Sequence, residues 1–583
     1  MQQVVGGEVV AAMLAREGVK KVFGIVDGTY MGLYASFSKY GIELVSPRHE
    51  TSAAHMAGAY ARLTGELGVC IASNGPGVAN MLSGIAVENG EGNRVLCITS
   101  CRRQGIAYPD RGGTFQYFDQ VAVTRPMTKW SGAVPSFDRI PEMLRRALRV
   151  SHKGRPGVVH VDIPENVING SFEIADDYLR DPHEYRRSSK LVPAPADVKR
   201  VAELMTRAER PLLHVGSGVV HAQAFAELQQ VAELCHVSVS TSWGARGALP
   251  ETHELSLPTS ALSALDEARK SADLVLVVGS RLGETDFWGK APYWGRPGEQ
   301  RLIQVDSDED ILGLNRKTEL AILADAKEFL SALALELKSA GLSASMKKAR
   351  EQRAAKLAEL KTAARKELDE ALGNDATPMH SAHVPTTVRK LMGDADVLVV
   401  DGGNTAVWSQ FYFDLRTPNT LLATFKLGML GAGVGQALGA QVAHPDKKVV
   451  CILGDGAMGF HMQEIETAVR NKLPVTFVVL CDKQWGMVKL TQQFAMSTVR
   501  EVIGSKDEGT INADFAETKF DDLARSMGAL GSRVSSPKEL EGVLRAAIDS
   551  DQPAVVHVDV DPMLHLWAPG LQTFKEMHQE PAG

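Results

Sequence analysis

Short apolar runs alternate with helical patterns along almost the whole chain of 583 residues. Runs such as "KVFGIV", "LGVCIAS" and "PVTFVVLC" are bounded by Gly, Pro or Asp, and longer segments with helical spacing of apolar residues follow them. This alternation is typical of parallel β-sheets whose strands are connected by crossover helices. We therefore predict an α/β fold made of parallel sheets.

The length of the chain argues for several such sheets rather than one. A chain of this size exceeds what a single hydrophobic core supports, and the alternating pattern divides into three blocks. We place the first domain at residues 1–175, a central Rossmann-like domain at 190–340, and a third domain at 375–583. A charge-rich segment at 345–372 is expected to be a solvated helical linker. Whether the last residues cover a site or form a packed tail stays open.

Composition and charge bound the function. Hydrophobic residues make up 44% of the chain and charged residues 23%, as in ordinary globular proteins. The net charge of -7 gives no electrostatic reason to expect nucleic acid or an anionic membrane as a partner. The apolar runs are much shorter than the ~20 residues of a membrane span. The six cysteines form no CxxC pair, which favours reduced thiols and a cytoplasmic location.

The most specific chemical signal is the segment "KVVCILGDGAMGFHMQEIETAVRNKLPVTFVVLCDKQWGMV". A strand leads into Gly454-Asp455-Gly456, and after one helix and one further strand the chain reaches Asp482. Glycines let the backbone approach a bound group, and the start of the helix offers free amides to an anion. Two carboxylates at neighbouring strand ends predict a Mg²⁺ or Ca²⁺ site that bridges to phosphates.

This segment resembles the thiamine-diphosphate-dependent enzymes, in which GDG is followed after 24 to 27 residues by a polar pair. The resemblance covers essentially the whole chain and implies, in order, a pyrimidine-binding domain, a central domain and a diphosphate-binding domain. It also implies that Mg²⁺ is held by Asp455, Asp482 and the backbone carbonyl of Gln484. The family usually has Asn-Asn where this chain has Cys481-Asp482, so one ligand carries an additional negative charge.

A second segment that resembles the family is "RHETSAAHMAGAYARLTG", in the first domain. The resemblance implies that Glu50 hydrogen-bonds the pyrimidine ring nitrogen of the cofactor and favours its imino tautomer, which then removes the C2 proton. Such a glutamate needs an apolar pocket, which an alanine-rich helix beside an apolar strand supplies. In "TFQYF", Gln116 occupies the position of a glutamine that faces the cofactor in many relatives.

Further positions are implied as cofactor contacts by the same resemblance. The segment "VVDGGNTAVW" brings three residues to the diphosphate, and "FKLGMLGAGVGQ" supplies a carbonyl for the pyrimidine amino group and a bulky residue that props the cofactor into a bent shape. The residues are Gly403, Asn404 and Thr405 at the diphosphate, Gly428 for the carbonyl, Leu430 as the prop, and Gly456, Ala457 and Trp485 near the metal loop.

Within the family, the chain is most similar to the acetolactate synthase-like branch. This implies a thiamine-diphosphate- and Mg²⁺-dependent C–C lyase or carboligase, which decarboxylates a pyruvate-like 2-oxo acid to an enamine or carbanion and transfers it to an electrophile. Two positions depart from acetolactate synthase. Thr491 stands where an aromatic residue shapes the acceptor pocket, and Thr285 or its neighbours stand where an Arg would pair with the second carboxylate. Without that Arg, the carboxylate of the second substrate lacks a charge-assisted hydrogen bond, which is costly in binding free energy.

Three alternatives stay open at this point. The first is a 2-hydroxyacyl-CoA lyase or oxalyl-CoA decarboxylase-like enzyme, which acts on acyl-CoA substrates. The second is an enzyme similar to sulfoacetaldehyde acetyltransferase or benzaldehyde lyase, and the third is a non-catalytic nucleotide-binding subunit. The chain retains Glu50, Asp455 and Asp482 together, which argues against a non-catalytic subunit. A subunit without activity would not need a glutamate for the cofactor ring and two carboxylates for a metal.

The central domain and the assembly complete the expectations. A Gly-x-Gly turn with Gly216 and Gly218, and acidic residues Asp306 and Asp325, are candidates to hold an ADP-like group. The family allows ADP, FAD or no nucleotide here, and we favour ADP or none. The resemblance implies a homodimer or homotetramer with the active site at the subunit interface, and a small-molecule substrate that is a 2-oxo acid or a 2-hydroxyacyl-CoA.

Overall fold

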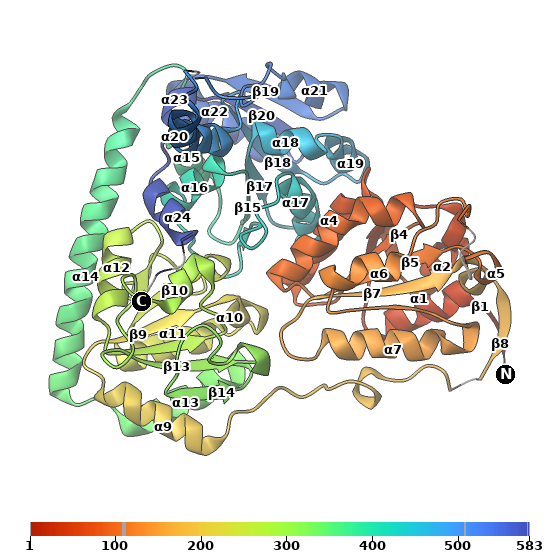
Figure 1. The fold of residues 1–583 in the computed structure, drawn as a ribbon, viewed down its shortest axis with the longest axis horizontal. Coiled ribbons are helices and arrows are strands. Elements are labelled where there is room, and N and C mark those ends of the chain that lie inside the picture. The colour runs from red at the N-terminus through yellow and green to blue at the C-terminus, as the bar shows by residue number, and fades with distance from the viewer. Residues whose placement is uncertain (1, 108–111, 176, 507–508, 580, 582–583) are drawn as a thin grey trace.

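The computed structural model describes residues 2–107, 112–175, 177–506, 509–579 and 581. It contains three sheets of six strands, in which all neighbouring strands are parallel, and a short antiparallel pair of β1 (Gln2–Val5) and β8 (Ser171–Ile174). Figure 1 shows the first domain in red and orange, the central domain in yellow and green, and the third in cyan and blue. The prediction of three parallel-sheet α/β units is confirmed.

The first sheet has the order β3-β2-β4-β5-β7-β6. Its middle strands β4, β5 and β7 are buried at every residue, because helices cover both faces of the sheet. The strands are β2 (Lys21–Gly24), β3 (Glu43–Val45), β4 (Gly68–Ala72), β5 (Val95–Cys101), β6 (Trp130–Ala133) and β7 (Val158–Pro164), and the main helices are α1 (Gly6–Arg16), α3 (Glu50–Thr64), α4 (Pro76–Glu91) and α7 (Ile140–Ser151).

The third sheet repeats this connectivity, with the order β16-β15-β17-β18-β20-β19. In both sheets the strand order reverses between the first and third strands, and ligands of doubly wound folds bind where the order reverses. The elements are β15 (Val397–Asp401), α16 (Asn404–Tyr412), β16 (Leu421–Leu422), α17 (Ala432–Ala443), β17 (Val449–Gly454), α18 (Asp455–His461), α19 (Glu464–Arg470), β18 (Val475–Cys481), α21 (Phe520–Ser526), β19 (Leu530–Val534), α22 (Pro537–Ile548) and β20 (Ala554–Asp559).

The central sheet follows a different order, β11-β10-β9-β12-β13-β14, which is that of a dinucleotide-binding fold. Its crevice therefore lies between the ends of β9 and β12. The elements are α9 (Pro195–Arg207), β9 (Pro211–Val215), α10 (Ser217–His221), α11 (Phe225–Cys235), β10 (Ser238–Thr241), β11 (Ser256–Leu257), α12 (Leu262–Ser271), β12 (Leu274–Val278), β13 (Arg301–Asp306), β14 (Leu320–Leu323) and α13 (Ala326–Ala340).

A long helix, α14 (Ala344–Glu370), runs from the central domain towards the third along one side of the molecule (Figure 1). Most of its residues are solvated, but Arg350 is 1% exposed. Its guanidinium donates to the carbonyl oxygens of Cys235 and Ala208 at 2.6 and 2.7 Å, and these carbonyls lie at the C-terminal ends of α11 and α9. Since such carbonyls lack intrahelical partners and carry negative partial charge, the arginine anchors α14 to the central domain.

The first and third domains meet where α3 packs against α17. A Cβ atom on Gly439 would lie 2.4 Å from the carbonyl oxygen of Met56, and one on Gly435 would lie 2.9 Å from the Cβ of His55. Only glycine allows this approach of the two helices. The contact fixes the position of the N-terminal end of α3, where Glu50 lies.

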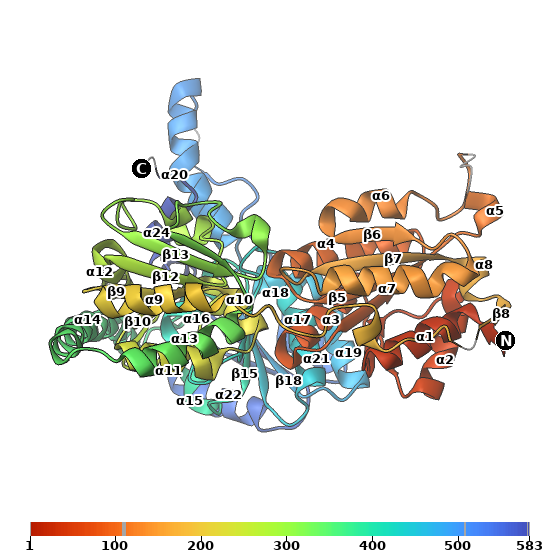
Figure 2. The ribbon, with the colours of Figure 1, turned by 90° about the horizontal axis from the view of Figure 1, so that it is seen from below.

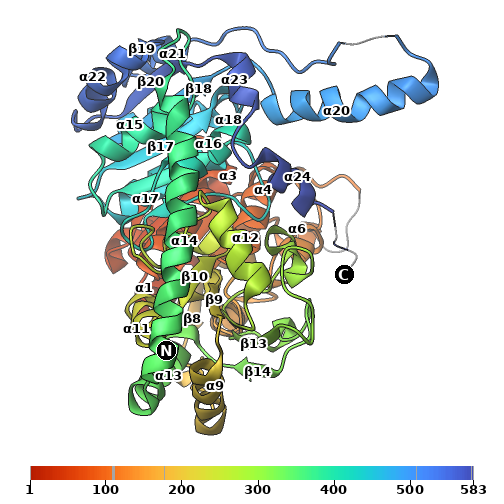
Figure 3. The ribbon, with the colours of Figure 1, turned by 90° about the vertical axis from the view of Figure 1, so that its left-hand side faces the viewer.

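Two C-terminal elements leave the body of the third domain. Helix α20 (Gly486–Ile503) projects outward, as Figures 2 and 3 show, and Val502 is 83% exposed on it. Helix α24 (Leu571–Met577) folds back onto the central domain, where Met577 is buried. Within the described part of the chain, no helix combines the length and the apolar character required to cross a bilayer.

Candidate active site

Two carboxylates meet at the carboxyl edge of the third sheet. Asp455 begins α18 directly after β17, and Asp482 directly follows the neighbouring parallel strand β18. The carboxylate of Asp455 accepts hydrogen bonds from the backbone nitrogens of Gly456 (2.7 Å) and Lys483 (2.8 Å). The carboxylate of Asp482 accepts one from Nε2 of Gln484 at 3.0 Å. Asp455 is 9% exposed and Asp482 8%, so both carboxylates are nearly removed from water.

Burial and mutual repulsion make this pair electrostatically costly. Burial, with the charge of Asp482, raises the pKa of Asp455 to about 7. Burial also raises the pKa of Asp482 to about 6. The ammonium of Lys483, the residue after Asp482, does not compensate them, because it pairs with Glu517 at 3.3 Å. Among the described residues, no Lys, Arg or His pairs with either carboxylate, so the oxygen donors suit a divalent cation.

The segment after β15 lies beside this pair. A Cβ on Gly454 would lie 3.2 Å from Oγ1 of Thr405, which places Thr405 at the base of the Gly-Asp-Gly turn. Asn404 is 4% exposed, yet neither its Oδ1 nor its Nδ2 has a hydrogen-bond partner. Buried amides are rarely left unpaired, so this side chain fits a polar ligand at the switch point of the sheet.

Trp485 supports the metal loop from the side. Its ring would lie 2.7 Å from a Cβ on Gly456, and it meets Phe515 edge-on at a centroid distance of 4.5 Å. The side chain of Gln484 donates from Nε2 to the carbonyl oxygen of Pro562 at 2.7 Å. Its side chain is thus engaged elsewhere, and its backbone carbonyl is the group that the resemblance assigns to the metal. Ala457 is buried inside α18.

The first domain presents a separate cluster at its own carboxyl edge. Glu50 begins α3, and its Oε2 accepts a hydrogen bond from Nδ2 of Asn80 at 3.0 Å. A Cβ on Gly77 would lie 3.3 Å from its other oxygen, so α4 borders the carboxylate. Gln116 lies on the loop against the same helix start, where its carbonyl accepts from Nδ2 of Asn74 at 2.9 Å. Sequence reasoning missed Asn80, which lies in the segment "SNGPGVAN" at residues 73–80.

Within one chain these two clusters lie apart. The rings of His49 and His461 lie 5.3 Å apart, so the segment before Glu50 borders the C-terminal end of α18. Asp455 is at the opposite end of this helix of 7 residues, about 9 Å away along the axis. In one subunit, the segment before Glu50 therefore borders the end of α18 that is remote from Asp455.

A large cavity of about 740 Å³ lies between all three domains. From the third domain it is lined by Gly403, Gly428 and Leu430. From the central domain it is lined by the ends of β9 and β12, where a Cβ on Gly216 would lie only 2.2 Å from the carbonyl oxygen of Gly279. The lining does not include Glu50, Gln116, Asp455 or Asp482. Three predicted cofactor contacts thus line the cavity, whereas Glu50, predicted to hydrogen-bond the pyrimidine ring, and the predicted metal ligands do not.

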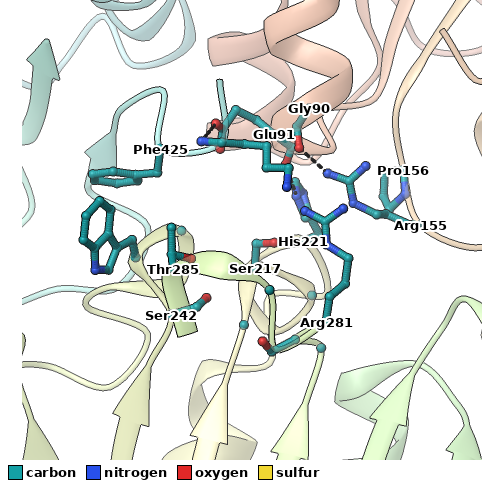
Figure 4. A pocket seen from close by; sticks show the side chains of 18 of the residues that line it. Gly90, Glu91, Arg155, Pro156, Ser217, His221, Ser242, Arg281, Thr285 and Phe425 are labelled. Atoms are coloured by element: carbon teal, nitrogen blue, oxygen red, sulfur yellow. Dashed lines mark hydrogen bonds between the residues drawn. The ribbon is translucent and has the colours of Figure 1, made fainter. Parts of the chain in front are cut away.

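Charged residues from the first domain and the central domain face each other across this cavity (Figure 4). Arg155 donates to the carbonyl oxygens of Asn89 and Gly90, and Figure 4 shows its guanidinium near Glu91 and Arg281. Asp306 lies at the end of β13, and burial raises its pKa to about 6. The residues of the first domain were missed from the sequence, because no motif marks them.

Glu91 is expected to make the stability of the protein depend on pH. Burial raises its pKa from 4.5 to about 7, although its Oε1 accepts a hydrogen bond from the backbone nitrogen of Lys426 at 2.7 Å. Between pH 4.5 and about 7, Glu91 is deprotonated in the unfolded chain but still protonated in the folded protein. The free energy of unfolding therefore falls as the pH rises through this range. We expect Glu91→Gln to raise the free energy of unfolding at pH 8 by about 2 kcal/mol and to flatten its pH dependence between pH 4.5 and 7.

Chemical denaturation of the ligand-free protein across this pH range measures the effect. The matched control is Glu299→Gln, at an exposed glutamate of the central domain. An equal change in both variants, or an unchanged slope in Glu91→Gln, would contradict the assignment.

Comparison with protein families matches all three domains. Residues 4–123 match the family model described as "Thiamine pyrophosphate enzyme, N-terminal TPP binding domain". Residues 198–333 match the central domain of the same enzymes, and residues 401–558 match their C-terminal TPP binding domain. Glu50 and Gln116 lie within the first match, and every candidate from Gly403 to Trp485 lies within the third.

Curated relatives align with nearly the full chain. The probable acetolactate synthase large subunit of Methanocaldococcus jannaschii is 29% identical over 574 residues, covering 96% of this chain and 92% of the relative. The acetolactate synthase large subunit of Corynebacterium glutamicum is 29% identical over 577 residues, covering 97% and 88%. The isozyme 3 large subunit of Escherichia coli is 27% identical over 583 residues, covering 97% and 96%.

Proposed function

Because the chain belongs to the thiamine pyrophosphate enzyme family, in its acetolactate synthase-like branch, we propose that it ligates the acyl unit of a 2-oxo acid to a second carbonyl compound. It is an enzyme, and thiamine diphosphate is its cofactor. When bound, the thiazolium of this cofactor supplies an electron sink for breaking and forming C–C bonds. The observation that carries the proposal is the buried pair Asp455 and Asp482 beside the unpaired amide of Asn404, within the matched C-terminal domain.

The metal is proposed to be Mg²⁺. Asp455, Asp482 and the backbone carbonyl of Gln484 would hold it, and hard oxygen donors of this kind suit Mg²⁺. The two carboxylates lack a compensating cation in the described structure, and a bound divalent ion would supply one. Gly403, Asn404 and Thr405 would then bind the diphosphate through backbone amides at the start of α16.

Glu50 is proposed to hold a proton at the pyrimidine ring nitrogen of the cofactor. Its Oε1 carries no hydrogen bond among the described contacts, whereas Oε2 accepts from Asn80. Burial, together with the charges of Asp27 and Glu50, raises the pKa of Tyr30, which keeps this phenol neutral beside the carboxylate. The free oxygen is therefore available to a ligand that approaches the edge of the first sheet.

A second copy of the chain is proposed to complete the site. Neither Glu50 nor Asp455 lines the large cavity of one subunit, so we propose that a ligand that contacts both lies between subunits. The edge that carries Glu50 and Gln116 also exposes apolar side chains, with Phe115 74% and Val26 53% exposed. A partner subunit would cover them. We therefore propose a homodimer as the smallest active unit, with a homotetramer as a larger assembly.

The crevice of the central sheet is proposed to bind an ADP or FAD group. It lies at the switch point between β9 and β12, where a dinucleotide-binding fold holds its ligand. Arg155, Arg281 and Lys426 line the same cavity and would attract phosphates.

All six cysteines are unpaired, which supports a reducing cytoplasmic location.

The alternatives from sequence are less well supported. The curated relatives above carry the acetolactate synthase name, so an acyl-CoA lyase, a sulfoacetaldehyde acetyltransferase-like or benzaldehyde lyase-like enzyme and a non-catalytic subunit are not favoured.

The test uses the protein loaded with thiamine diphosphate and Mg²⁺. We expect it to accelerate hydrogen–deuterium exchange at C2 of the cofactor by at least about 10²-fold, measured by NMR after acid quench. Carbon-13 pyruvate should then lose its carboxyl carbon as CO₂ and enter a ligated product. Absence of exchange would refute the catalytic proposal, and consumption of acyl-CoA esters alone would replace the 2-oxo acid assignment.

A further inference from the structure

A lysine of the C-terminal helix lines the large cavity that Gly403, a predicted diphosphate contact, also lines. Lys575 of α24 lines this cavity together with Met487 and Thr285. Its Nζ donates a hydrogen bond to Oγ1 of Thr491 at 2.7 Å, and this hydroxyl in turn donates to the backbone carbonyl of Met487 at 2.8 Å. The helix that ends the chain is thus joined to the start of α20.

This chain of contacts brings the ammonium close to the cofactor contacts. A Cβ on Gly403 would lie 2.6 Å from Cγ of Met487, so Met487 covers the glycine that we assign to the diphosphate. Thr491 is four residues further along α20, a rise of about 6 Å. Lys575 therefore lies near Gly403 on the wall of this cavity, on a helix that also contacts the central domain through Glu576 and His578.

Lys575 has no ion-pair partner within the described part of the chain. The carboxylates near it are engaged: Glu576 accepts from the hydroxyl of Tyr293 at 3.0 Å, and Glu284 lies 2.9 Å from Nδ1 of His578. A single threonine hydroxyl uses one of the three N–H donors of an ammonium group. The two remaining donors are available to an anion.

The helix that carries Lys575 is held firmly in place. Leu571 and Met577 are buried, and the ring of Phe574 stacks on Trp243 with centroids 5.7 Å apart and an interplanar angle of 14°. Phe425 meets the same tryptophan edge-on at 5.8 Å. These three rings all line the cavity, so they give it an apolar wall beside the ammonium.

We propose that Lys575 binds the carboxylate of the second carbonyl substrate and makes the enzyme selective for anionic acceptors. This inference rests on the proposed carboligase function. It supplies the cation that Thr285 cannot provide, and the apolar wall suits the aliphatic part of a short 2-oxo acid. Lys575 is a specificity-determining residue in this account.

The experiment compares two acceptors that differ by the carboxylate, 2-oxobutyrate and propanal, with pyruvate as the donor. We expect Lys575→Met to raise the KM for 2-oxobutyrate by about 10- to 100-fold, which corresponds to the loss of one charge-assisted hydrogen bond. The KM for propanal should change less than about twofold, and Lys575→Arg should restore most of the preference. Lys538→Met, at a lysine with 77% side-chain exposure on α22, is the matched control.

A purely structural role predicts a different pattern. If Lys575 only fastens α24 to α20, Thr491→Val should reproduce Lys575→Met and raise both KM values equally, which would overturn the proposal. If Lys575 binds the acceptor, Thr491→Val should keep the preference for 2-oxobutyrate over propanal, because the ammonium is still present.

A second measurement does not depend on turnover. Lys575 of the holoenzyme is acylated with an amine-reactive ester, and peptide mass mapping follows its labelling. We expect 2-oxobutyrate to protect Lys575 and propanal not to protect it; equal labelling with and without 2-oxobutyrate would refute the proposal. Because C2 exchange tests the proposed function separately, failure of the two proposals can be told apart.

Discussion

Glu50→Gln is expected to lower hydrogen–deuterium exchange at C2 of bound thiamine diphosphate by about 10²- to 10⁴-fold. The amide keeps the shape of the side chain and can still accept from Asn80, which donates to Oε2 at 3.0 Å in the native protein. It cannot share a proton with the pyrimidine ring nitrogen. The loss should therefore appear in the exchange rate at saturating cofactor, while the affinity for the cofactor changes much less.

The matched control is Glu43→Gln, at an exposed glutamate of β3 that pairs with Lys21. Exchange is measured by NMR on holoenzyme quenched in acid, and cofactor affinity by titration of the ligand-free protein. An exchange rate in Glu50→Gln equal to that of the control would show that another group carries the proton. The comparison requires that the variant is folded and saturated with cofactor. Circular dichroism establishes the first condition and the titration establishes the second.

Asp455→Asn is expected to produce the second large effect, a weakening of Mg²⁺-dependent cofactor binding by more than about 100-fold. Asp455 is a proposed ligand and also accepts from two backbone nitrogens, those of Gly456 and Lys483, which shape the metal loop. Replacing a supporting residue of a metal site already costs about 10- to 100-fold, and a ligand should cost more. Isothermal titration with thiamine diphosphate, at fixed Mg²⁺, measures the affinity.

Asp482→Asn separates the ligand role from the charge. It introduces the residue that the family usually has at this position, so it should weaken binding by only about tenfold. In the absence of metal it should raise the free energy of unfolding by about 1 kcal/mol, because the repulsion between two buried carboxylates is removed. Equal losses in the two variants, or a fall in the stability of metal-free Asp482→Asn, would contradict the arrangement.

Part of the site could be predicted because its signals are local. Glycines around Asp455, a helix after them and one strand before Asp482 place both carboxylates at the same edge once the two strands pair in parallel. The structure has this pairing, with Gly454 opposite Leu480 in the register of β17 and β18. The functional roles of these residues are proposals that the variants above test.

Other parts carried no local signal. Lys575 lies near Thr491 because α24 returns to the central domain after the last strand, and nothing in "LQTFKEM" marks this path. Arg155 and Glu91 face the central crevice from a different domain. The segment after the last strand was left open between a lid and a packed tail, and the structure packs it against Trp243.

By itself, the sequence determined the α/β class, the three parallel sheets and the ends of the strands that carry the acidic residues. These follow from periodicity and turn residues, whose effects act over a few positions. Only the tertiary structure decided that α3 packs on α17, with His49 beside the end of α18 that is remote from Asp455, and that α24 lines the same cavity as Gly403. Such contacts join residues hundreds of positions apart, and they depend on how whole domains pack, which no local pattern encodes.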